Sequence, residues 1–298
     1  MHNIKSQRAA VLVNLLGVLA ALTPARAFEV AQDVSNLTFT AGGKPVLAYR
    51  HAGYPCKPYA AQLWTPAGVA VLRDAPHDHK HHHALMFALS AAGTSFWEET
   101  AKGGFQIVRQ LSQRADGLTQ QLDWQTPASN LVLKETRTLQ LHACAGATLL
   151  TWRTKLETPP GCAAVELTGH HYYGLGARFL QSLDGQGVFQ NATGKPGDVV
   201  RGDERLVAAR WAAFSAATAG RTITFALFDH PENPRHPNQL FSMAKPFGYL
   251  ACTLNLWKAP LLLKAGAPLD LRYGVALLDG TADAARLEKL QRHWLGFQ

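Results

Sequence analysis

Short stretches in which apolar and polar residues alternate dominate the chain. Alternation with a period of two is typical of strands that bury one face. Clusters of Gly, Pro, Asn and Asp separate these stretches, as turns between strands require. The pattern predicts strands over residues 37–40, 45–49, 118–125, 131–141, 148–157, 164–170, 222–228, 249–256 and 269–278.

One segment near the C-terminus has a helical pattern instead. Leu287, Leu290 and Trp294 recur at helical spacing within residues 282–294. Thr281 is placed to cap the first turn, and an acidic residue follows it there. Because the chain contains no repeat or linker, we expect one all-β domain over residues 28–298, a large antiparallel β-sandwich with a short C-terminal helix.

The first residues form a separate pattern. Two basic residues precede an apolar run over residues 9–22, and Ala25-Arg26-Ala27 offers small residues at the spacing that a signal peptidase reads. The run is shorter than the about 20 apolar residues of a membrane span. We therefore expect residues 1–27 to be a signal peptide, with a periplasmic or secreted mature protein that begins at Phe28. No stable membrane insertion is expected after cleavage, and an uncleaved anchor is the alternative.

Composition narrows the class of partner. The chain is 47% hydrophobic, which is enough for a large core. Its formal charge of +8 falls to +5 when Lys5, Arg8 and Arg26 leave with the signal peptide. The remaining basic residues form no dense block and no interleaved aromatic platform. Nucleic acid is therefore disfavoured, and an anionic small molecule or a glycan is the better expectation.

The four cysteines are Cys56, Cys144, Cys162 and Cys252. An even number in an oxidising compartment permits disulfides. Cys144 and Cys162 are the first candidate pair, because they are placed to flank a hairpin. Isolated buried thiols are the alternative, since free cysteine is often buried.

A histidine-rich run over residues 73–83 is the strongest candidate for chemistry. Five of the 13 histidines lie within residues 77–83. Neutral imidazole is a common ligand of zinc, copper, iron and nickel. In an extended loop, His79, His81 and His83 point the same way, which suits a divalent metal with an open coordination position. Adventitious metal binding and a polar loop without a role are the alternatives.

The same run suits a general acid/base and hydrogen-bonding wall for a sugar. In this interpretation His79 and His82 are catalytic candidates, and Arg73 and Asp78 bind the substrate.

Strand parity places further charged groups on the core side of the predicted strands. Glu135 and Arg137 share the apolar face of the strand over residues 131–141, while His171 and Asp229 continue the core-side faces of their own strands. Unpaired charges are rarely buried. We therefore expect Glu135 and Arg137 to form an internal salt bridge, to lie at an edge where this face turns to solvent, or to lie on the charged floor of a pocket. We take Glu135, Asp229 and His171 as catalytic candidates and Arg137 as a substrate-binding one.

Two further segments present polar and aromatic side chains. Three prolines stiffen residues 229–237, and residues 170–179 combine glycines with aromatic rings that suit a sugar face. A rigid surface turn and a glycine-rich bend are the structural alternatives. The substrate-binding candidates in these segments are Arg178, His230, Asn233, Arg235 and His236. Trp97, from another part of the chain, is a further candidate.

Several common catalytic motifs do not occur in the sequence. It has no Gly-x-Ser-x-Gly elbow, Walker loop, dinucleotide fingerprint or His-Glu-x-x-His helix. Serine hydrolases, nucleotide-dependent enzymes and zincins are therefore disfavoured.

Taken together, these motifs resemble a bacterial family named methane oxygenase PmoA, which is otherwise a domain of unknown function. The resemblance covers nearly all of the mature chain. It implies a β-sandwich often encoded among carbohydrate-degradation functions. The combination of paired histidines and a carboxylate in a sandwich is also similar to aldose mutarotases, so a mutarotase-like supersandwich is the expected variant. The resemblance rests on residues 73–82, 95–97, 135–138, 174–178, 191–194 and 229–237.

These observations predict a periplasmic protein that acts on a sugar or glycoside by histidine/carboxylate acid–base chemistry, as a lyase, hydrolase or epimerase. A noncatalytic glycan-binding module is the alternative, and a metal-dependent oxidoreductase, as the family name suggests, is the second alternative. Buried histidines bonded to carboxylates favour the enzyme, and a shallow aromatic groove favours the binding module. Three imidazole nitrogens that converge on one point favour the metal-dependent oxidoreductase.

Overall fold

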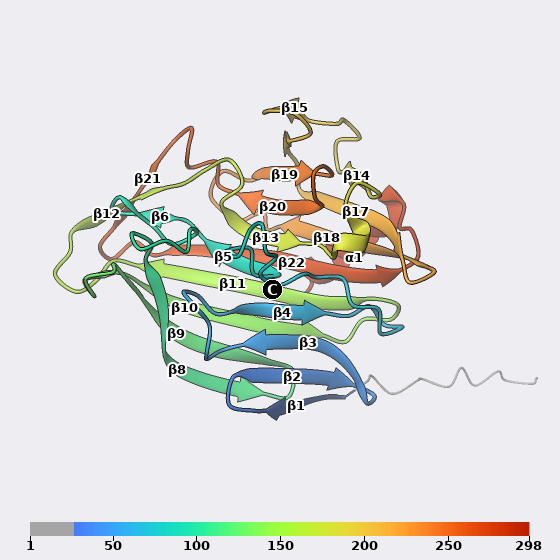
Figure 1. Cartoon of the computed structure of the whole chain (residues 1–298), viewed down its shortest axis with the longest axis horizontal. Coiled ribbons are helices and arrows are strands. Elements are labelled where there is room, and N and C mark those ends of the chain that lie inside the picture. Colours follow the sequence, from blue (N-terminus) through green and yellow to red (C-terminus); the bar gives the residue numbers. More distant parts are fainter. Residues whose placement is uncertain (1–26, 298) are drawn as a thin grey trace, which may run out of the picture.

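Antiparallel strands make up most of the computed structural model, which describes residues 27–297. The ten-stranded sheet has the order β1 (Phe28–Gln32), β2 (Asn36–Ala41), β3 (Lys44–Arg50), β4 (Tyr59–Leu63), β5 (Leu85–Ala88), β13 (Gly174–Arg178), β20 (Tyr249–Thr253), β19 (Gln239–Met243), β16 (Arg205–Ala208) and β15 (Asp198–Val199) (Figure 1). The eight-stranded sheet has the order β14 (Val188–Asn191), β17 (Trp211–Thr218), β18 (Arg221–Asp229), β22 (Leu269–Asp279), β11 (Thr148–Glu157), β10 (Leu131–His142), β9 (Gly117–Gln125) and β8 (Phe105–Arg114).

A smaller sheet and two helical segments complete the architecture. The four-stranded sheet has the order β21 (Leu261–Lys264), β12 (Ala164–Thr168), β6 (Ser90–Ala91) and β7 (Thr94–Ser95). A 3₁₀ turn, η1 (Gln181–Leu183), follows β13, and the α-helix α1 (Ala284–Leu295) follows β22.

One continuous core lies between the two large sheets. Phe39 and Leu47 from the ten-stranded sheet belong to the same buried cluster as Trp152 and Phe225 from the eight-stranded sheet. Burial alternates along β2, as the period of two requires. Each such side chain contributes roughly 1.5–3 kcal/mol when it leaves water. The sandwich is therefore held together by the alternating apolar positions of the sequence.

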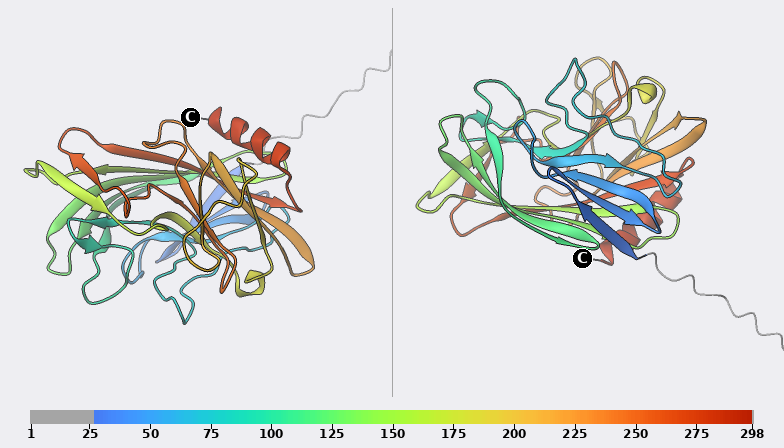
Figure 2. Two further views of the ribbon diagram at one scale, coloured as in Figure 1. Left: turned by 90° about the horizontal axis from the view of Figure 1, so that it is seen from above. Right: turned by 60° about the horizontal axis from the view of Figure 1, so that its bottom comes forward.

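Helix α1 covers the outer face of the eight-stranded sheet (Figure 2). Leu287, Leu290 and Trp294 pack there in a second buried cluster. A Cβ atom at Gly274 on β22 would lie only 2.7 Å from the Trp294 ring, so a glycine is needed here to leave room for that ring. The expected cap Thr281 is wrong, because the side chain of Asp283 accepts the hydrogen bond from Arg286 N at 2.8 Å.

The antiparallel β-sandwich with a C-terminal helix is confirmed, and each of the nine predicted strands overlaps a strand of the structure. The glycine-rich bend is wrong. Residues 174–178 form β13, a central strand with all five residues buried. A Cβ atom at Gly174 would lie 2.1 Å from the carbonyl oxygen of Cys252, so glycine is required by the close approach of β20.

The expected disulfide is also wrong, because all four cysteines are free thiols. Cys144 and Cys162 do not flank a hairpin. They lie beyond opposite ends of β11, which has ten residues. At about 3.4 Å per residue the strand alone separates them by about 34 Å, whereas a disulfide needs Cα atoms within about 7 Å.

The expected signal peptide falls outside the described part of the chain, apart from its last residue, Ala27. Within residues 27–297, no helix has the length and apolarity that a bilayer span requires.

Candidate functional site

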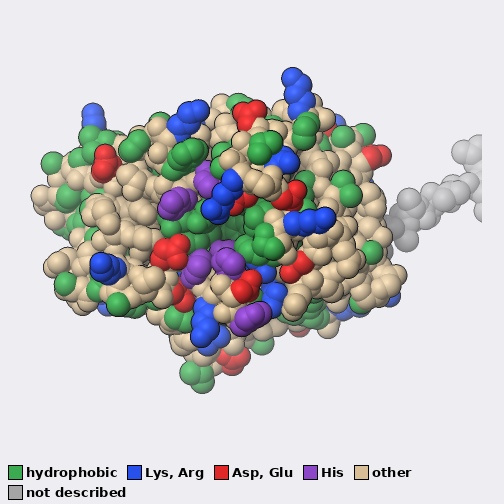
Figure 3. Space-filling view, turned by 45° about the horizontal axis from the view of Figure 1, so that its top comes forward, with side chains coloured by type: hydrophobic (Ala, Val, Ile, Leu, Met, Phe, Trp, Pro, Cys, Tyr) green, Lys and Arg blue, Asp and Glu red, His purple; other side chains and the backbone are tan. Residues whose placement is uncertain are grey.

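A polar cavity of about 190 Å³ lies on the outer face of the ten-stranded sheet. The orientation follows from β20, where Cys252 points toward the eight-stranded sheet and its Sγ lies 3.9 Å from Asp229 Oδ1 on β18. Tyr249 has the opposite parity and therefore points outward. Figure 3 shows histidine, acidic and basic side chains around a hydrophobic hollow. We call this cavity the histidine pocket, and its lining residues are His79, His81, His82, Glu98, Tyr172, Arg201, Glu204, Phe241, Met243, Phe247 and Tyr249.

The floor of the histidine pocket is aromatic. Tyr249 on β20 and Phe241 on β19 lie 6.1 Å apart, measured between ring centroids. A Cβ atom at position 176 would lie 1.9 Å from the Tyr249 hydroxyl, so Gly176 lets this ring extend across β13. The hydroxyl is buried and has no hydrogen-bond partner among residues 27–297. Because burial raises the pKa of Tyr249 well above 10, it remains a neutral O–H group.

The histidine-rich run folds as a tight loop and not as an extended one. His82 N donates to the carbonyl of His79 at 2.9 Å, and Ala75 N donates to the carbonyl of His82 at 2.9 Å. The turn stacks the His79 ring on the His82 ring, with centroids 4.8 Å apart. The alternation that an extended loop would have is lost. His79 and His82 therefore share a side, and both line the histidine pocket.

His83 turns into the interior and is 2% exposed. Its Nδ1 lies 2.7 Å from Asp74 Oδ1 and its Nε2 lies 2.7 Å from Glu99 Oε1, which also accepts from Lys57 Nζ at 2.8 Å. Burial lowers the pKa of His83, but the bonds to Asp74 and Glu99 outweigh burial and raise it above 6.5.

The predicted metal face of His79, His81 and His83 is therefore wrong, because the loop geometry separates His83 from the other two rings. In the part of the chain that the structure describes, no group of three or more His, Cys, Asp or Glu residues has a geometry that suits a metal ion.

Two imidazole–carboxylate pairs stand on different walls of the pocket. His81 Nδ1 lies 3.6 Å from Glu98 Oε2, and both residues line the cavity. His171 Nε2 lies 3.0 Å from Glu204 Oε2, with Glu204 at the cavity and His171 behind it. Burial lowers the pKa of both histidines, although each neighbouring carboxylate opposes it. Both imidazoles are thus neutral near pH 7 and able to accept a proton.

His82 has a different role from the one expected for a proton donor. Burial, together with the neighbouring His81 and His79, lowers its pKa to about 2. Its Nδ1 is buried and has no hydrogen-bond partner within the described residues. A ring that stays neutral at any ordinary pH offers hydrogen bonds to a ligand but does not supply protons.

Glu135 and Arg137 form an internal salt bridge and not a pocket floor. Arg137 is fully buried, and its Nε lies 2.7 Å from Glu135 Oε1. Glu135 also accepts from Trp124 Nε1 at 2.8 Å and from Thr154 Oγ1 at 3.0 Å. The remaining guanidinium nitrogens bond to the Pro58 carbonyl, Gln106, Tyr49 and Glu135. Because all their polar atoms are already paired inside the sandwich, neither residue reaches a ligand in the histidine pocket.

Asp229 organises the proline-rich loop instead of acting in the pocket. Its fully buried carboxylate accepts from Asn233 Nδ2 at 2.8 Å and from Asn238 N at 2.8 Å, and lies 2.7 Å from His236 Nδ1. His230 is buried, with its ring 5.7 Å from the Trp294 ring under α1. The predicted meeting of Asp229 or His236 with the histidine run in one pocket is therefore wrong.

Four other predicted residues do not line the pocket, and three of them, Arg178, Trp97 and Asp78, contact residues that do. The Arg178 guanidinium lies 3.4 Å from the centroid of the Phe247 ring. Trp97 is fully buried and stacks on Tyr173 at 4.7 Å, so it is not a surface wall. These residues position the lining side chains. In the same group, Arg73 Nη1 lies 3.9 Å from Asp184 Oδ2 and Asp78 Oδ2 lies 3.0 Å from His79 Nδ1.

The carboxylate on the far wall was not predicted from the sequence. Glu204 lies in the turn between β15 and β16, where Arg201 Nε contacts both of its carboxylate oxygens at 3.0 Å. A charged turn of this kind is ordinary on a protein surface, so no local signal marks it. Phe241, Phe247 and Tyr249 were missed because they are indistinguishable in sequence from core residues.

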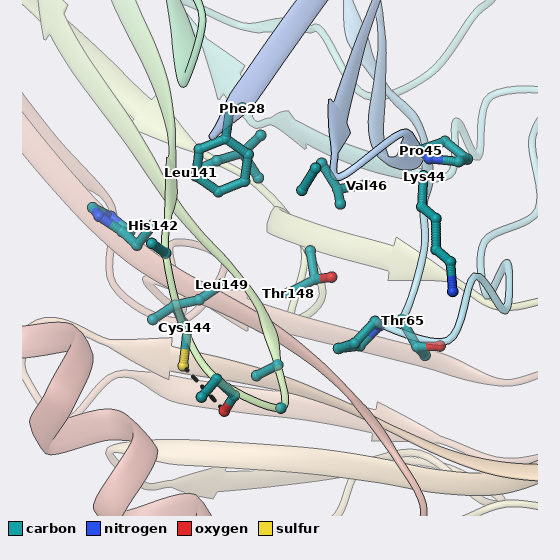
Figure 4. Close-up of a pocket in the computed structure, with 16 residues that line it drawn as sticks. Phe28, Lys44, Pro45, Val46, Thr65, Leu141, His142, Cys144, Thr148 and Leu149 are labelled. Atoms are coloured by element: carbon teal, nitrogen blue, oxygen red, sulfur yellow. Dashed lines mark hydrogen bonds between the residues drawn. The ribbon is translucent and has the colours of Figure 1, made fainter. Parts of the chain in front are cut away.

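A larger cavity of about 510 Å³ lies between the β2–β3 and β10–β11 turns (Figure 4). Its lining is mostly apolar, with Phe28, Val46 and Leu141 among the lining residues. The His142 ring points away from it, and His142 Nε2 lies 2.7 Å from Thr151 Oγ1. Because no acidic residue is among its lining residues, this second cavity is a poor candidate for acid–base chemistry.

We predict that the protein loses stability as the pH falls below about 6.5, the ordinary pKa of histidine. Burial lowers the pKa of His142 to about 4 and that of His82 to about 2. The pKa of each histidine is lower in the folded chain than in the unfolded chain, so the unfolded chain takes up the proton first as the pH falls. The free energy of unfolding is therefore unaffected above pH 6.5 and falls on acidification by about 1.4 kcal/mol per pH unit for each histidine.

Urea unfolding of the wild type and of His142→Gln at about pH 7 and about pH 5 measures this loss. The variant is expected to lose less stability between the two conditions. The raised pKa of His83 acts in the opposite direction, which is why the comparison needs a variant. An equal loss in both proteins would contradict the prediction.

Comparisons with solved structures find proteins that are similar to this chain at low identity. A protein from Synechocystis sp. PCC 6803 has a TM-score of 0.42 and 10% identity and covers 94% of this chain and 100% of that one. An α-galactosidase from Lactobacillus brevis has a TM-score of 0.45 and 8% identity, over 91% of this chain and 42% of that one. A galactose mutarotase related enzyme from Lactobacillus acidophilus has a TM-score of 0.42 and 9% identity, over 86% of this chain and 98% of that one.

Sequence comparisons give one family. No curated protein matches the chain. The model of a family of unknown function, DUF6807, matches residues 36–292. The resemblance to methane oxygenase PmoA is therefore wrong, since the matching model carries no mention of that family or of methane oxygenase.

Proposed function

The chain belongs to the family of unknown function DUF6807, and we propose that its histidine pocket binds one neutral sugar ring and moves protons on it by histidine/carboxylate acid–base chemistry. The observation that carries the proposal is that two imidazole–carboxylate pairs from separate segments of the chain meet at one cavity. These pairs are His81 with Glu98 and His171 with Glu204.

Each pair has the parts that acid–base catalysis needs. A neutral imidazole accepts a proton from a sugar hydroxyl, and the adjacent carboxylate stabilises the imidazolium that forms. His81 and Glu98 do this at the cavity itself. On the far wall, Glu204 meets the ligand, and His171 behind it positions the carboxylate. The buried pair of His171 and Glu204, opposite the partly exposed pair of His81 and Glu98, favours an enzyme over a noncatalytic glycan-binding module.

The unpaired polar atoms of the pocket suit hydroxyl groups. The Tyr249 hydroxyl and His82 Nδ1 are both buried without a partner in the described chain, which is unfavourable unless a ligand pairs them. Each offers one hydrogen bond in a fixed direction. The Tyr249 and Phe241 rings below them offer an apolar surface for the C–H face of a sugar.

The size and charge of the histidine pocket narrow the class of ligand that it can bind. A cavity of about 190 Å³ is smaller than the about 300–1,000 Å³ that hold a drug-sized molecule, so one ring is the fitting unit. Two carboxylates and one arginine are among the lining residues. This balance favours a neutral sugar over the anionic small molecule that net charge alone suggested.

Isothermal titration calorimetry with a panel of neutral monosaccharides tests the proposal. We expect at least one sugar to bind, and Tyr249→Phe and Glu204→Gln to weaken its binding. Cys144→Ala, at the second cavity, is the matched control and is expected to change nothing. Binding that is insensitive to both pocket variants, or no binding at all, contradicts the proposal.

We also propose that the protein is exported to the periplasm or beyond the cell. The support is the basic, apolar and small-residue order of residues 1–27. N-terminal sequencing of protein from the periplasmic fraction is expected to begin at Phe28. Recovery of Met1 in the membrane fraction would contradict export with cleavage.

A further inference from the structure

Trp257 is unusual among the tryptophans because it is 49% exposed. Five others, Trp97, Trp124, Trp152, Trp211 and Trp294, are at most 1% exposed. A large aromatic side chain left in water at a defined place is often part of a binding surface.

Trp257 stands at the edge of the histidine pocket. Its ring centroid lies 5.7 Å from that of His171. Among the lining residues that His171 contacts are Glu204, at 3.0 Å, and Phe241, whose ring centroid is 5.5 Å away. A short series of contacts therefore connects the floor of the cavity to the exposed indole.

The loop that carries Trp257 is braced at both ends. It joins β20 to β21, and Arg235 donates from Nη1 to the Leu254 carbonyl at 2.7 Å and from Nη2 to the Pro260 carbonyl at 3.2 Å. Inside the loop, Asn255 has a φ of 55° and its carbonyl accepts from Lys258 N at 3.2 Å. The indole is thus held outward by a fixed turn.

This bracing gives the proline-rich segment a role that the pocket itself does not give it. Within residues 229–237, Arg235 donates to both ends of the Trp257 loop, and Asp229 anchors the segment from inside. The segment therefore positions the loop that carries Trp257.

We propose that Trp257 is the stacking platform for the second sugar ring of a neutral oligosaccharide or glycoside whose terminal ring occupies the histidine pocket. The inference rests on the proposed function, because it requires a sugar in that pocket. The cavity holds one ring, so any further ring lies outside it. Trp257 is a half-exposed aromatic surface at that edge.

Calorimetry with matched monosaccharide and disaccharide pairs tests the inference: glucose with cellobiose and maltose, and galactose with lactose. We expect a disaccharide to bind more tightly than its monosaccharide. Trp257→Ala is expected to weaken disaccharide binding about 3- to 10-fold and to leave monosaccharide binding unchanged. Trp257→Phe is expected to retain most of the disaccharide affinity.

Phe297→Ala is the matched control, since Phe297 is an aromatic residue 42% exposed that stacks on His142, away from the pocket. Circular dichroism of each variant establishes that it is folded. Disaccharide binding that is no tighter than monosaccharide binding, or that Trp257→Ala leaves unchanged, overturns the inference and leaves the proposed function standing. If none of these sugars binds, the inference and the proposed function fail together.

Discussion

Replacing Glu135 by leucine is expected to lower the free energy of unfolding by about 3–5 kcal/mol, because it leaves a buried guanidinium without its charged partner. Arg137 is 0% exposed, and its Nε and one terminal nitrogen bond to Glu135. The variant also strands Trp124 Nε1, which donates to the same carboxylate. Urea unfolding monitored by fluorescence measures the loss.

The double variant Glu135→Leu/Arg137→Met provides the control. Removing both charges together is expected to recover much of the lost stability, because a buried ion pair contributes little beyond its own desolvation. A loss below about 1 kcal/mol for Glu135→Leu alone would contradict the interpretation of this pair as an internal salt bridge.

Replacing Glu98 or Glu204 by glutamine is expected to lower turnover by about 10²- to 10⁴-fold, the usual contribution of a positioned acid or base. Glutamine keeps the shape but cannot stabilise an imidazolium or carry a proton. Both residues line the cavity, with His81 Nδ1 3.6 Å from Glu98 and His171 Nε2 3.0 Å from Glu204.

Two reactions are compared for the second prediction: anomer interconversion of freshly dissolved monosaccharides and hydrolysis of neutral nitrophenyl glycosides. Glu157→Gln is the control, because Glu157 is an exposed carboxylate paired with Lys155 at the end of β11. If both pocket variants retain full rates in every reaction that the wild type catalyses, these carboxylates have no catalytic role.

The sequence pattern predicted eight of the 18 strands of the two large sheets, and among those it missed is β17, which is buried on both faces. All but one residue of β17 are buried, and four of its eight residues are alanines. Ala213 pairs with Ala226, which pairs with Ala276, and these small side chains lie in the cluster under α1. Because the outer face of β17 packs against helix α1 and not against solvent, both of its faces are apolar and the sequence shows no alternation with a period of two.

The sequence identified the histidine-rich loop of the candidate site, but not the residues from other segments that meet it in the pocket. Histidine density drew attention to the loop whose His79 and His82 line the histidine pocket, but a turn and not an extended chain decides which rings face together. Parity placed Glu135 inside correctly. Whether an inward charge meets solvent or a salt bridge depends on other strands, here on Trp124 and Thr154. Glu204 comes from a turn that only the tertiary fold brings to the histidines.

A crystal structure of the mature protein soaked with the monosaccharide that binds best tests the central claim most directly. We expect one sugar ring over Tyr249 and Phe241, with hydroxyl groups within hydrogen-bond distance of His82 Nδ1, Glu98 and Glu204. A sugar found in the second cavity beside Leu141, or a histidine pocket that stays free of sugar at saturating concentration, would contradict it.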